Sequence, residues 1–582
     1  MSIQDQHDHL SHTPVGVYDL YPTFPLPAGQ IRAGFDAIAE IIVSVIEKGA
    51  LMLAMDGYGG TLWDDLRAGV EQVLKARGVE VEWRNVATAL LPEDQIAKLI
   101  EPNLGGDDPI FGKLCERDLI EFFDEAKLDV LAELSANNRP CIVYGVGAAL
   151  VGKPDVLLYV DVPKDEIQYR MAAKTINNLG FHAPANYKQL YFVDWPVLNR
   201  EKARLLPQLD WWIDGQKPDR LTVISGDDLR AALTLMSASP FRARPWLAPG
   251  VWGGQWMKSH FPGIPQNVPN YAWSFELIVP ENGLTFESDG ERLEGSFDLL
   301  MFQHFREVLG TAAERFGVDF PIRFDYLDTM QGGNLSVQVH PSDSYIHENF
   351  GEPFTQDESY YITTCEPGAQ VNLGFRDGIN SDEFRQAVEQ SARAGQAIEI
   401  ERFVGRYPAQ PHDLFLIPNG TIHGSGAGNL VLEISATPYI YTFKIYDWVR
   451  KDLNGRMRPL NIDRAWKNLH FERQEDYTRE KLIPRPSVLR DGDGWRELLV
   501  GDHDNLFYRV QRYEFEQPIS AETEGRCHIL NVVEGAAVIV ETPNGQRARY
   551  NYAETFIIPA AAGSYRLIPL GGACKVVFAF VK

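Results

Sequence analysis

The chain has few cysteines, and none shows the spacing that usually gives cysteine a structural role. Its 582 residues include five: Cys115, Cys141, Cys365, Cys527 and Cys574. The total is odd and no pair forms a CxxC motif, which argues against a disulfide framework and against a cysteine-ligated zinc site. This usage fits a reducing compartment best, so we expect a cytoplasmic protein.

Excess positive charge and long apolar runs are also missing. Lys and Arg total 55 against 80 Asp and Glu, a formal net charge of −25. Nucleic-acid binding needs clustered Lys and Arg to neutralise phosphates, so we expect no nucleic-acid partner. The most apolar early stretch, 35–55, is interrupted by Glu40, Glu47 and Lys48. Because this stretch cannot span a bilayer and the polar start lacks a signal-peptide pattern, we expect no membrane partner.

What is present is the composition of a soluble globular protein, with 45% hydrophobic and 23% charged residues. The length predicts about three to five folding units. Residues 1–29 are rich in proline and are predicted to form a flexible arm. His7, His9 and His12 within it fit a solvated tail better than a metal-binding tract.

Residues 30–240 show an α/β pattern. Continuous apolar runs of the kind buried on both faces of a parallel sheet occur at 50–55, 141–144 and 156–162. Helical patterns alternate with them, at 31–48, 63–76, 118–137 and 164–178. This alternation predicts a doubly wound sheet.

A glycine turn, Asp56-Gly57-Tyr58-Gly59-Gly60, follows the first predicted strand. Backbone N–H groups in such a turn suit a phosphate when a helix follows. The P-loop motif also needs a Lys followed by Ser or Thr, and this chain has Leu62-Trp63 there. The GxGxxG fingerprint fails as well, because its sixth position is Leu62.

In the order of its elements, this region resembles uridine-kinase-like P-loop proteins. After the glycine turn come the strand ending at 143–146, the segment 159–163, and Arg170 on the following helix. The resemblance implies a P-loop-kinase-like domain that is degenerate, since the phosphate-binding lysine is missing. A structural domain, a residual nucleotide-binding or regulatory domain and, least favoured, a working kinase all stay open.

Beyond residue 240, short strand patterns and frequent turns predict β-sandwiches or jelly rolls. We expect one such domain at 241–484, with a small helical insertion at 381–394, and another at 485–582. The first carries the clearest chemical signal, Leu335-Ser336-Val337-Gln338-Val339-His340-Pro341. Side chains alternate along a strand, so Ser336, Gln338 and His340 project to one face.

Two further groups could complete a metal site with Gln338 and His340. Glu358 begins a later predicted strand, and His423 follows the turn at 417–421. Antiparallel strands of one barrel can bring such distant positions together. Two imidazoles, one carboxylate and one amide oxygen suit Zn²⁺ or a similar divalent cation.

These motifs resemble those of class I mannose-6-phosphate isomerases: LSxQxHP, a Glu that begins an aromatic strand, and PxGTxHxxG. The resemblance extends from Val251-Trp252-Gly253-Gly254 to the segment 446–460 and covers roughly 240–582. It implies cupin-like isomerase domains that act on a small-molecule sugar or sugar phosphate. The implied reaction is the interconversion of mannose 6-phosphate and fructose 6-phosphate, or of a related sugar pair, through a cis-enediol.

By the same resemblance, one Zn²⁺ per chain would be held by Gln338, His340, Glu358 and His423. Ser336 would contact the substrate, and Lys444 would stabilise the enediolate as the catalytic cation. The general base is not assignable from the sequence. Three nearby polar residues are expected at the surface instead: Asp343, His347 and His412.

The chain departs from the family pattern at two cationic positions. Gln356 stands where the family has Lys two residues before the ligand Glu, and Lys444 stands where it has Arg. Lys lacks the planar fork of Arg but keeps its charge, and loss of the Lys removes a cation from a sugar-phosphate site. The alternative is therefore a non-catalytic or regulatory protein that binds a sugar or nucleotide and retains the metal site.

Overall fold

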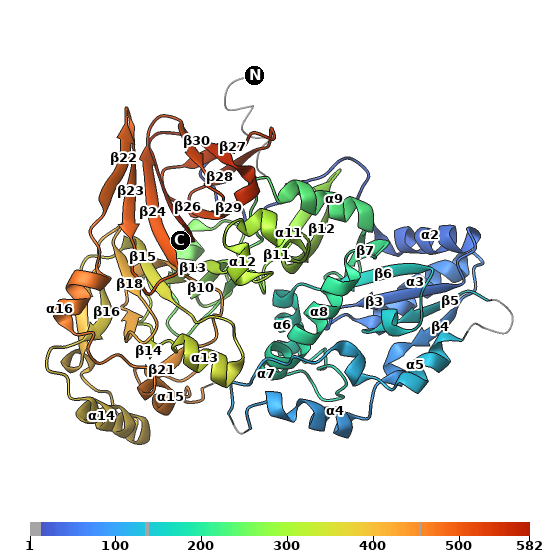
Figure 1. The fold of residues 1–582 in the computed structure, drawn as a ribbon, viewed down its shortest axis with the longest axis horizontal. Helices are drawn as coiled ribbons and strands as arrows, with labels where there is room; N and C mark the ends of the chain where they lie inside the picture. The colour runs from blue at the N-terminus through green and yellow to red at the C-terminus, as the bar shows by residue number, and fades with distance from the viewer. Residues whose placement is uncertain (1–12, 107, 134–138, 453–454) are drawn as a thin grey trace.

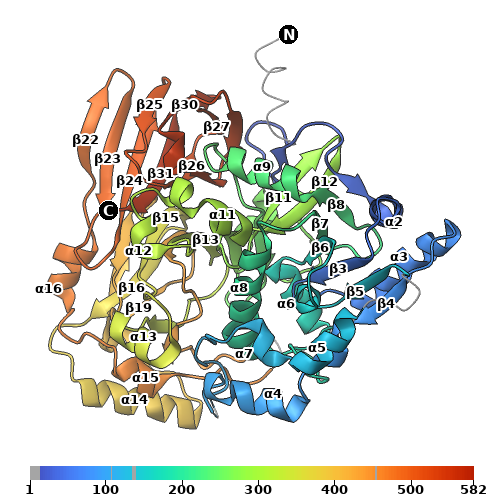
Figure 2. The same ribbon diagram turned by 45° about the vertical axis from the view of Figure 1, so that its right-hand side comes forward.

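A computed structural model describes residues 13–106, 108–133, 139–452 and 455–582. An α/β region lies on one side, and two β-rich regions make up the other (Figure 1). Helices α6 (Lys164–Ala172), α7 (Tyr187–Gln189) and α8 (Trp195–Leu205) lie between the first sheet and the β-rich part (Figures 1 and 2). Within the described ranges, no helix combines the length and apolar character needed to cross a membrane.

The α/β region is built on a seven-stranded sheet. Its strands run in the order β2 (Arg32–Ala33), β8 (Thr222–Ser225), β7 (Trp211–Asp214), β6 (Val156–Asp161), β3 (Met52–Gly57), β5 (Cys141–Tyr144) and β4 (Glu82–Asn85). The five strands from β7 to β4 are parallel. Each predicted strand of this region is therefore present, and the sheet is mainly parallel as expected.

Helices cover both faces of this sheet because its strands are apolar on both sides. Leu53 and Met55 pack with the apolar side chains of α2 (Gly34–Glu47) and α3 (Trp63–Ala76). Ala54, on the opposite face, belongs to the cluster that includes residues of α8 and α9 (Gly226–Met236). The predicted doubly wound arrangement is what the structure contains.

Two predicted helices are shorter than expected. The pattern at 118–137 gives a 3₁₀ turn (Leu119–Phe122) and α5 (Glu125–Ala132), because Asp124 adopts an extended backbone and caps α5; 134–138 lie outside the described residues. The pattern at 164–178 ends with α6 at Ala172, and Lys174 has a left-handed backbone with φ 59° that cannot continue the helix. Another helix, α4 (Glu93–Ile100), follows β4.

The middle β region consists of two antiparallel sheets. One runs β18 (Leu414–Ile417), β15 (Glu358–Cys365), β20 (Asn429–Ala436), β13 (Ile322–Asp328), β10 (Trp273–Leu277), β9 (Trp246–Ala248). The other runs β17 (Val404–Pro408), β16 (Gln370–Phe375), β19 (His423–Ser425), β14 (Val337–Val339), β21 (Phe443–Tyr446). The predicted helical insertion is α14 (Ser381–Ala394), which begins at the side-chain cap of Asn380.

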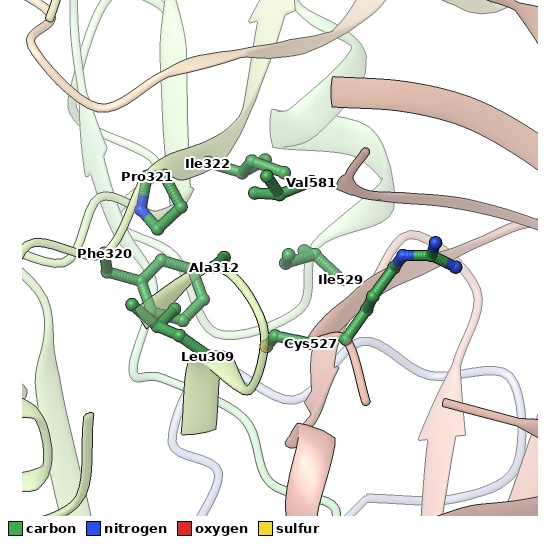
Figure 3. A pocket seen from close by; sticks show the side chains of 9 residues that line it. Leu309, Ala312, Phe320, Pro321, Ile322, Cys527, Ile529 and Val581 are labelled. Carbon is green, nitrogen blue, oxygen red and sulfur yellow. The ribbon is translucent and has the colours of Figure 1, made fainter. Parts of the chain in front are cut away.

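The last region is a second pair of antiparallel sheets. They run β22 (Ser487–Gly492), β23 (Trp495–Gly501), β24 (Tyr508–Phe515), β31 (Cys574–Val581), β26 (His528–Glu534), β29 (Thr555–Ile558) and β25 (Ile519–Glu522), β30 (Ser564–Leu570), β27 (Ala537–Glu541), β28 (Arg547–Asn551). This region meets α11 (Asp298–Leu309) and the chain after it at an apolar contact formed by Leu309, Ile322, Ile529 and Val581 (Figure 3). The cavity there, about 10 Å³, is far too small for a sugar.

Residues 13–29, predicted to belong to a flexible arm, are packed onto the β regions. Phe24–Pro25 (β1) pairs with β11 (Gly283–Ser288), which also pairs with β12 (Glu291–Ser296). Tyr18 is buried, stacks on Phe261 and hydrogen-bonds to Glu276. The prediction of a flexible arm fails for this stretch because its aromatic side chains fill sites in distant regions. His7, His9 and His12 lie outside the described residues.

Candidate metal centre and adjoining cavity

The four predicted ligands meet between the two sheets of the middle β region. Gln338 on β14 and His423 at the start of β19 are direct partners across an antiparallel pair. His340 directly follows β14, which ends at Val339 because Pro341 cannot continue the ladder. Glu358 begins β15 in the opposite sheet. Sequence-distant strands thus bring the predicted groups together.

Three of these groups form a compact buried cluster. The ligand atoms of His340, Glu358 and His423 all lie within 4.8 Å of one another. Glu358 Oε2 is 3.0 Å from His423 Nε2 and lies in close contact with His340 Nε2. The three side chains are at most 1% exposed. Burying a carboxylate is unfavourable unless it is paired or bound to a cation, so this cluster needs a compensating charge.

The contacts of the two Nδ1 atoms show that the imidazoles are neutral, so the compensating positive charge has to come from another group. His340 Nδ1 lies 3.1 Å from the carbonyl oxygen of Tyr441, and His423 Nδ1 lies 2.9 Å from that of Thr421. A carbonyl only accepts, so each Nδ1 carries the hydrogen and each neutral ring presents the Nε2 lone pair to Glu358. Burial lowers the pKa of His340, which favours this neutral form.

A bound cation would therefore satisfy three acceptors that otherwise face one another. Burial raises the pKa of Glu358, and positive charge on the two imidazoles beside it would hold that pKa well below its usual value. With both rings neutral, a bound cation would supply that positive charge instead. The second oxygen of Glu358, Oε1, is buried and has no hydrogen-bond partner among the described residues. Two neutral imidazoles and an ionised carboxylate, one of whose oxygens is unpaired, are a donor set that fits a divalent metal.

Gln338 and Ser336 lie at the edge of this cluster. Gln338 Nε2 is 3.3 Å from His423 Nε2, so the amide nitrogen faces the imidazole. The hydroxyl of Ser336 donates to Gln338 Oε1 at 2.9 Å. A serine hydroxyl can also accept, so it can hold the amide in either orientation. Ser336 therefore supports Gln338 as well as reaching the adjoining space.

That space is a cavity of about 430 Å³, large enough for a hexose. The predicted site residues Ser336, Gln338, Glu358 and Lys444 all line it. Burial is the main cause that lowers the pKa of Lys444 to about 8, and the nearby guanidinium of Arg458 acts in the same direction. Within the described ranges, no residue forms an ion pair or a side-chain hydrogen bond with its ammonium group.

Gln356, the second departure from the family pattern, also lines the cavity. It is only 2% exposed, and its Oε1 has no hydrogen-bond partner among the described residues. A buried amide oxygen without a partner costs free energy, which a hydrogen-bond donor on a ligand could recover. The position is thus inside the site, and its side chain is neutral where the family carries a cation.

Several further polar groups, not predicted from the sequence, line the same cavity. Asp325 on β13 and Glu433 on β20 are direct cross-strand partners. Burial raises the pKa of Asp325 to about 7, although Arg323 acts against this rise, and burial likewise raises the pKa of Glu433. Arg323 forms ion pairs with both carboxylates. Arg323 and Asp325 alternate with apolar residues along β13. This alternation is the sequence signal that indicates them.

An aromatic wall completes the β-region part of the cavity. It consists of four side chains, Trp246, Trp252, Trp273 and Phe275. Trp246 stacks on Phe275 with ring centroids 4.1 Å apart. An apolar aromatic surface facing a few polar groups is the usual construction of a small-molecule site.

The three polar residues expected at the surface lie away from this cavity. Asp343 Oδ1 accepts a hydrogen bond from the Thr355 backbone, and His347 is exposed on α13 (Asp343–Phe350). His412 is partly buried, because it contacts Tyr361 and Glu534. None of the three lines the cavity.

The carboxylate of Asp56, at the start of the glycine turn, is held by one N–H group of the turn and two of the segment that follows β5. Asp56 accepts hydrogen bonds from the backbone N–H groups of Gly57, Gly147 and Ala149. A cavity of about 540 Å³ adjoins the turn, and Asp64 and Asp65 of the first turn of α3 line it. None of its described lining residues is Lys or Arg. This charge pattern disfavours a phosphate at the turn.

Comparison with known proteins divides the chain close to the boundary between the α/β region and the β-rich regions. Residues 34–238 match the family model described as "Domain of unknown function (DUF8485)", and the comparisons do not support the P-loop-kinase-like resemblance. The C-terminal region is similar to mannose-6-phosphate isomerases. This similarity confirms the predicted resemblance for that region.

Two curated relatives and one solved structure illustrate the similarity. The mannose-6-phosphate isomerase ManA of Bacillus subtilis is 25% identical over 350 residues, covering 58% of this chain and 95% of the relative. The mannose-6-phosphate isomerase of Streptococcus mutans is 28% identical over 229 residues, covering 39% and 67%. A crystal structure of the Bacillus subtilis mannose 6-phosphate isomerase is 20% identical, with a TM-score of 0.48, covering 59% and 99%.

Proposed function

We propose that this protein is a zinc-dependent aldose–ketose isomerase that interconverts mannose 6-phosphate and fructose 6-phosphate, or a related pair of sugars, through a cis-enediol. The observation that carries the proposal is the buried His340–Glu358–His423 cluster at a cavity of hexose size. The similarity of the C-terminal region to mannose-6-phosphate isomerases supports the same reaction class.

The residues that would hold Zn²⁺ are His340, Glu358, His423 and Gln338. Gln338 would join as an oxygen ligand with its amide in the reversed orientation, in which Ser336 can accept from the amide nitrogen. Zinc bound there would supply Lewis-acid polarisation of the sugar oxygens at the reacting carbons. The hydrogen bonds from Nδ1 to the carbonyls of Tyr441 and Thr421 hold both imidazoles ready for that role.

The chain's own residues would then handle charge and protons. In its ammonium form, Lys444 stabilises the negative charge that develops on the enediolate oxygens. The paired carboxylates of Asp325 and Glu433 would take the proton from one carbon and return it to its neighbour. Burial raises the pKa of Asp325 to about 7 and raises that of Glu433 as well. A base is most effective when its pKa lies near the working pH, which favours Asp325 as the base.

Phosphate recognition is the property that separates the related substrates. Among the described residues, three cations line the cavity, but Arg323 is paired with Glu433, and Arg458 with Asp447. Gln356 contributes no charge. We therefore expect a weaker preference for a phosphorylated sugar than a site with lysine at position 356 would have.

A coupled isomerase assay with phosphorylated and free hexoses tests the proposal. Activity should be lost on chelation and restored by Zn²⁺, with one metal bound per chain. The proposal is wrong if the metal-loaded protein converts no aldose or ketose. Sugar binding without turnover would instead support the non-catalytic alternative.

A further inference from the structure

The cavity beside the metal cluster is not built by the isomerase-like region alone. Two residues of the α/β region, Gln168 on α6 and Tyr187 at the start of α7, also line it. Both lie in the segment 34–238 that matches the domain of unknown function. The similarity to the isomerases covers the C-terminal region, so these two side chains lie outside it.

Hydrogen bonds to the middle β region hold both side chains in place. Gln168 Nε2 donates to Glu281 Oε2, and the hydroxyl of Tyr187 is 3.3 Å from Glu281 Oε1. The same hydroxyl lies 2.7 Å from that of Tyr439, which also lines the cavity. Glu281 is 1% exposed. One buried carboxylate thus positions both residues of the α/β wall.

The α/β region itself is anchored beside the cavity by buried charges. Within the α/β region, Lys202 Nζ lies 3.0 Å from Asp161 Oδ1, and it also donates across the interface to the hydroxyl of Ser296 at 2.6 Å. Lys164 pairs with Asp298 across the same interface, and both side chains of that pair are nearly buried. Leaving one partner of such a buried pair alone is costly, so the two regions are held in one arrangement. The wall is therefore preformed.

The part of the cavity wall formed by Gln168 and Tyr187 can form hydrogen bonds but carries no charge. An amide and a phenol hydroxyl can pair with hydroxyl groups as donors or acceptors, while the aromatic wall can cover the apolar face of a ring. A site built to hydrogen-bond a hydroxyl discriminates strongly against a ligand that lacks it. We propose that the α/β region closes the sugar site, an inference that rests on the proposed function. Gln168 and Tyr187 bind sugar hydroxyls there and determine which sugar is accepted.

The test compares full-length Gln168→Leu and Tyr187→Phe with the wild-type protein on a panel of free and phosphorylated aldoses and ketoses. We expect kcat/KM for the preferred sugar to fall at least tenfold, mainly through KM, and the ranking of sugars to change. Zinc content should stay at the wild-type value, and the thermal midpoint should fall by no more than a few degrees, because each variant removes one hydrogen bond to buried Glu281. Tyr169→Phe on the same helix is the matched control, because Tyr169 is 53% exposed and does not line this cavity; its kinetics should not change.

Failure of this inference differs visibly from failure of the proposed function. If the wild-type protein is active and both variants keep its KM values and sugar ranking, the wall does not touch substrate and the inference is wrong. If the wild-type protein is inactive, sugar binding followed through the fluorescence of Trp246, Trp252 and Trp273 decides. Binding weakened at least tenfold in both variants supports the wall without an isomerase. Undetectable binding, or equal binding in all proteins, overturns it.

Discussion

Gln338 and His423 face each other across two antiparallel strands although 85 residues separate them in the chain. Glu358 of the opposite sheet lies 3.0 Å from the same imidazole. Metal binding is therefore expected to depend on the packing of two sheets as well as on the ligands themselves.

His423→Ala should reduce bound zinc from about one per chain to less than a tenth and lower isomerase activity at least a hundredfold, because it removes one of three convergent donors. Metal analysis after dialysis and the coupled assay measure both effects. His347→Ala is the control, since His347 is exposed and lies outside the cavity. Full zinc content in the His423 variant would contradict the assigned centre.

Lys444→Met should lower kcat by about 10²–10³, the usual loss when one group that stabilises developing negative charge is removed. Zinc content should not change. Lys444→Arg should restore part of kcat, because charge is kept while shape changes. Lys98→Met, at a side chain 78% exposed, should behave as the wild type. An unchanged kcat in the methionine variant at position 444 would remove this residue from the mechanism.

Gln356→Lys should shift preference towards a phosphorylated sugar. A cation at this buried position in the cavity wall adds a charge-assisted hydrogen bond to phosphate. We expect the ratio of kcat/KM for mannose 6-phosphate to that for mannose to rise about tenfold, or about 1.4 kcal/mol. Gln356→Met controls for the change in shape. Equal ratios in the two variants would show that the phosphate does not reach this position.

Nucleotides should not stabilise the α/β region. The described lining of the cavity at the glycine turn holds Asp64 and Asp65 and no cation, and Asp56 occupies the backbone N–H groups nearby. We expect millimolar Mg²⁺-ATP to move the thermal midpoint by less than about 1 °C, since a ligand stabilises only in proportion to its binding. A rise of several degrees that depends on nucleotide concentration would restore the nucleotide-binding hypothesis.

The last pair of sheets, which contains His528 on β26, should lose stability on mild acidification because of this histidine. Burial, with a smaller effect of Arg526, lowers its pKa to about 3, against about 6.5 when unfolded. The unfolded chain then binds more protons between these values, so stability falls as pH drops below 6.5, by about 2 kcal/mol at pH 5.

Urea denaturation midpoints at pH 7 and pH 5 measure this effect. His528→Gln should flatten the pH dependence, because glutamine has no proton to bind. His182→Gln, at a side chain 94% exposed, should leave the pH dependence as in the wild type. A variant at position 528 with the full wild-type slope would place the acid sensitivity elsewhere.

Much of the fold was predictable because apolar periodicity is a local property. The runs at 141–144 and 156–162 became strands of a buried parallel sheet, since residues apolar on both faces must be covered on both sides. The single helix predicted at 118–137 is interrupted at Asp124, which is the N-cap of α5. A pattern of apolar residues does not reveal such a cap. The packed stretch 13–29 was missed because its partners, such as Glu276, lie far along the chain.

For the site, the sequence by itself determined which groups are candidates for metal binding. Strand alternation puts Gln338 and His340 on one face, and the resemblance to the motifs of class I mannose-6-phosphate isomerases singles out Glu358 and His423. Only the tertiary structure decided what surrounds them. Asp325 and Glu433 become partners through strand pairing, and Gln168 and Tyr187 reach the cavity from another region. The physical reason is that a ligand set can be carried by short motifs, whereas a cavity wall is made by surfaces that meet only after folding.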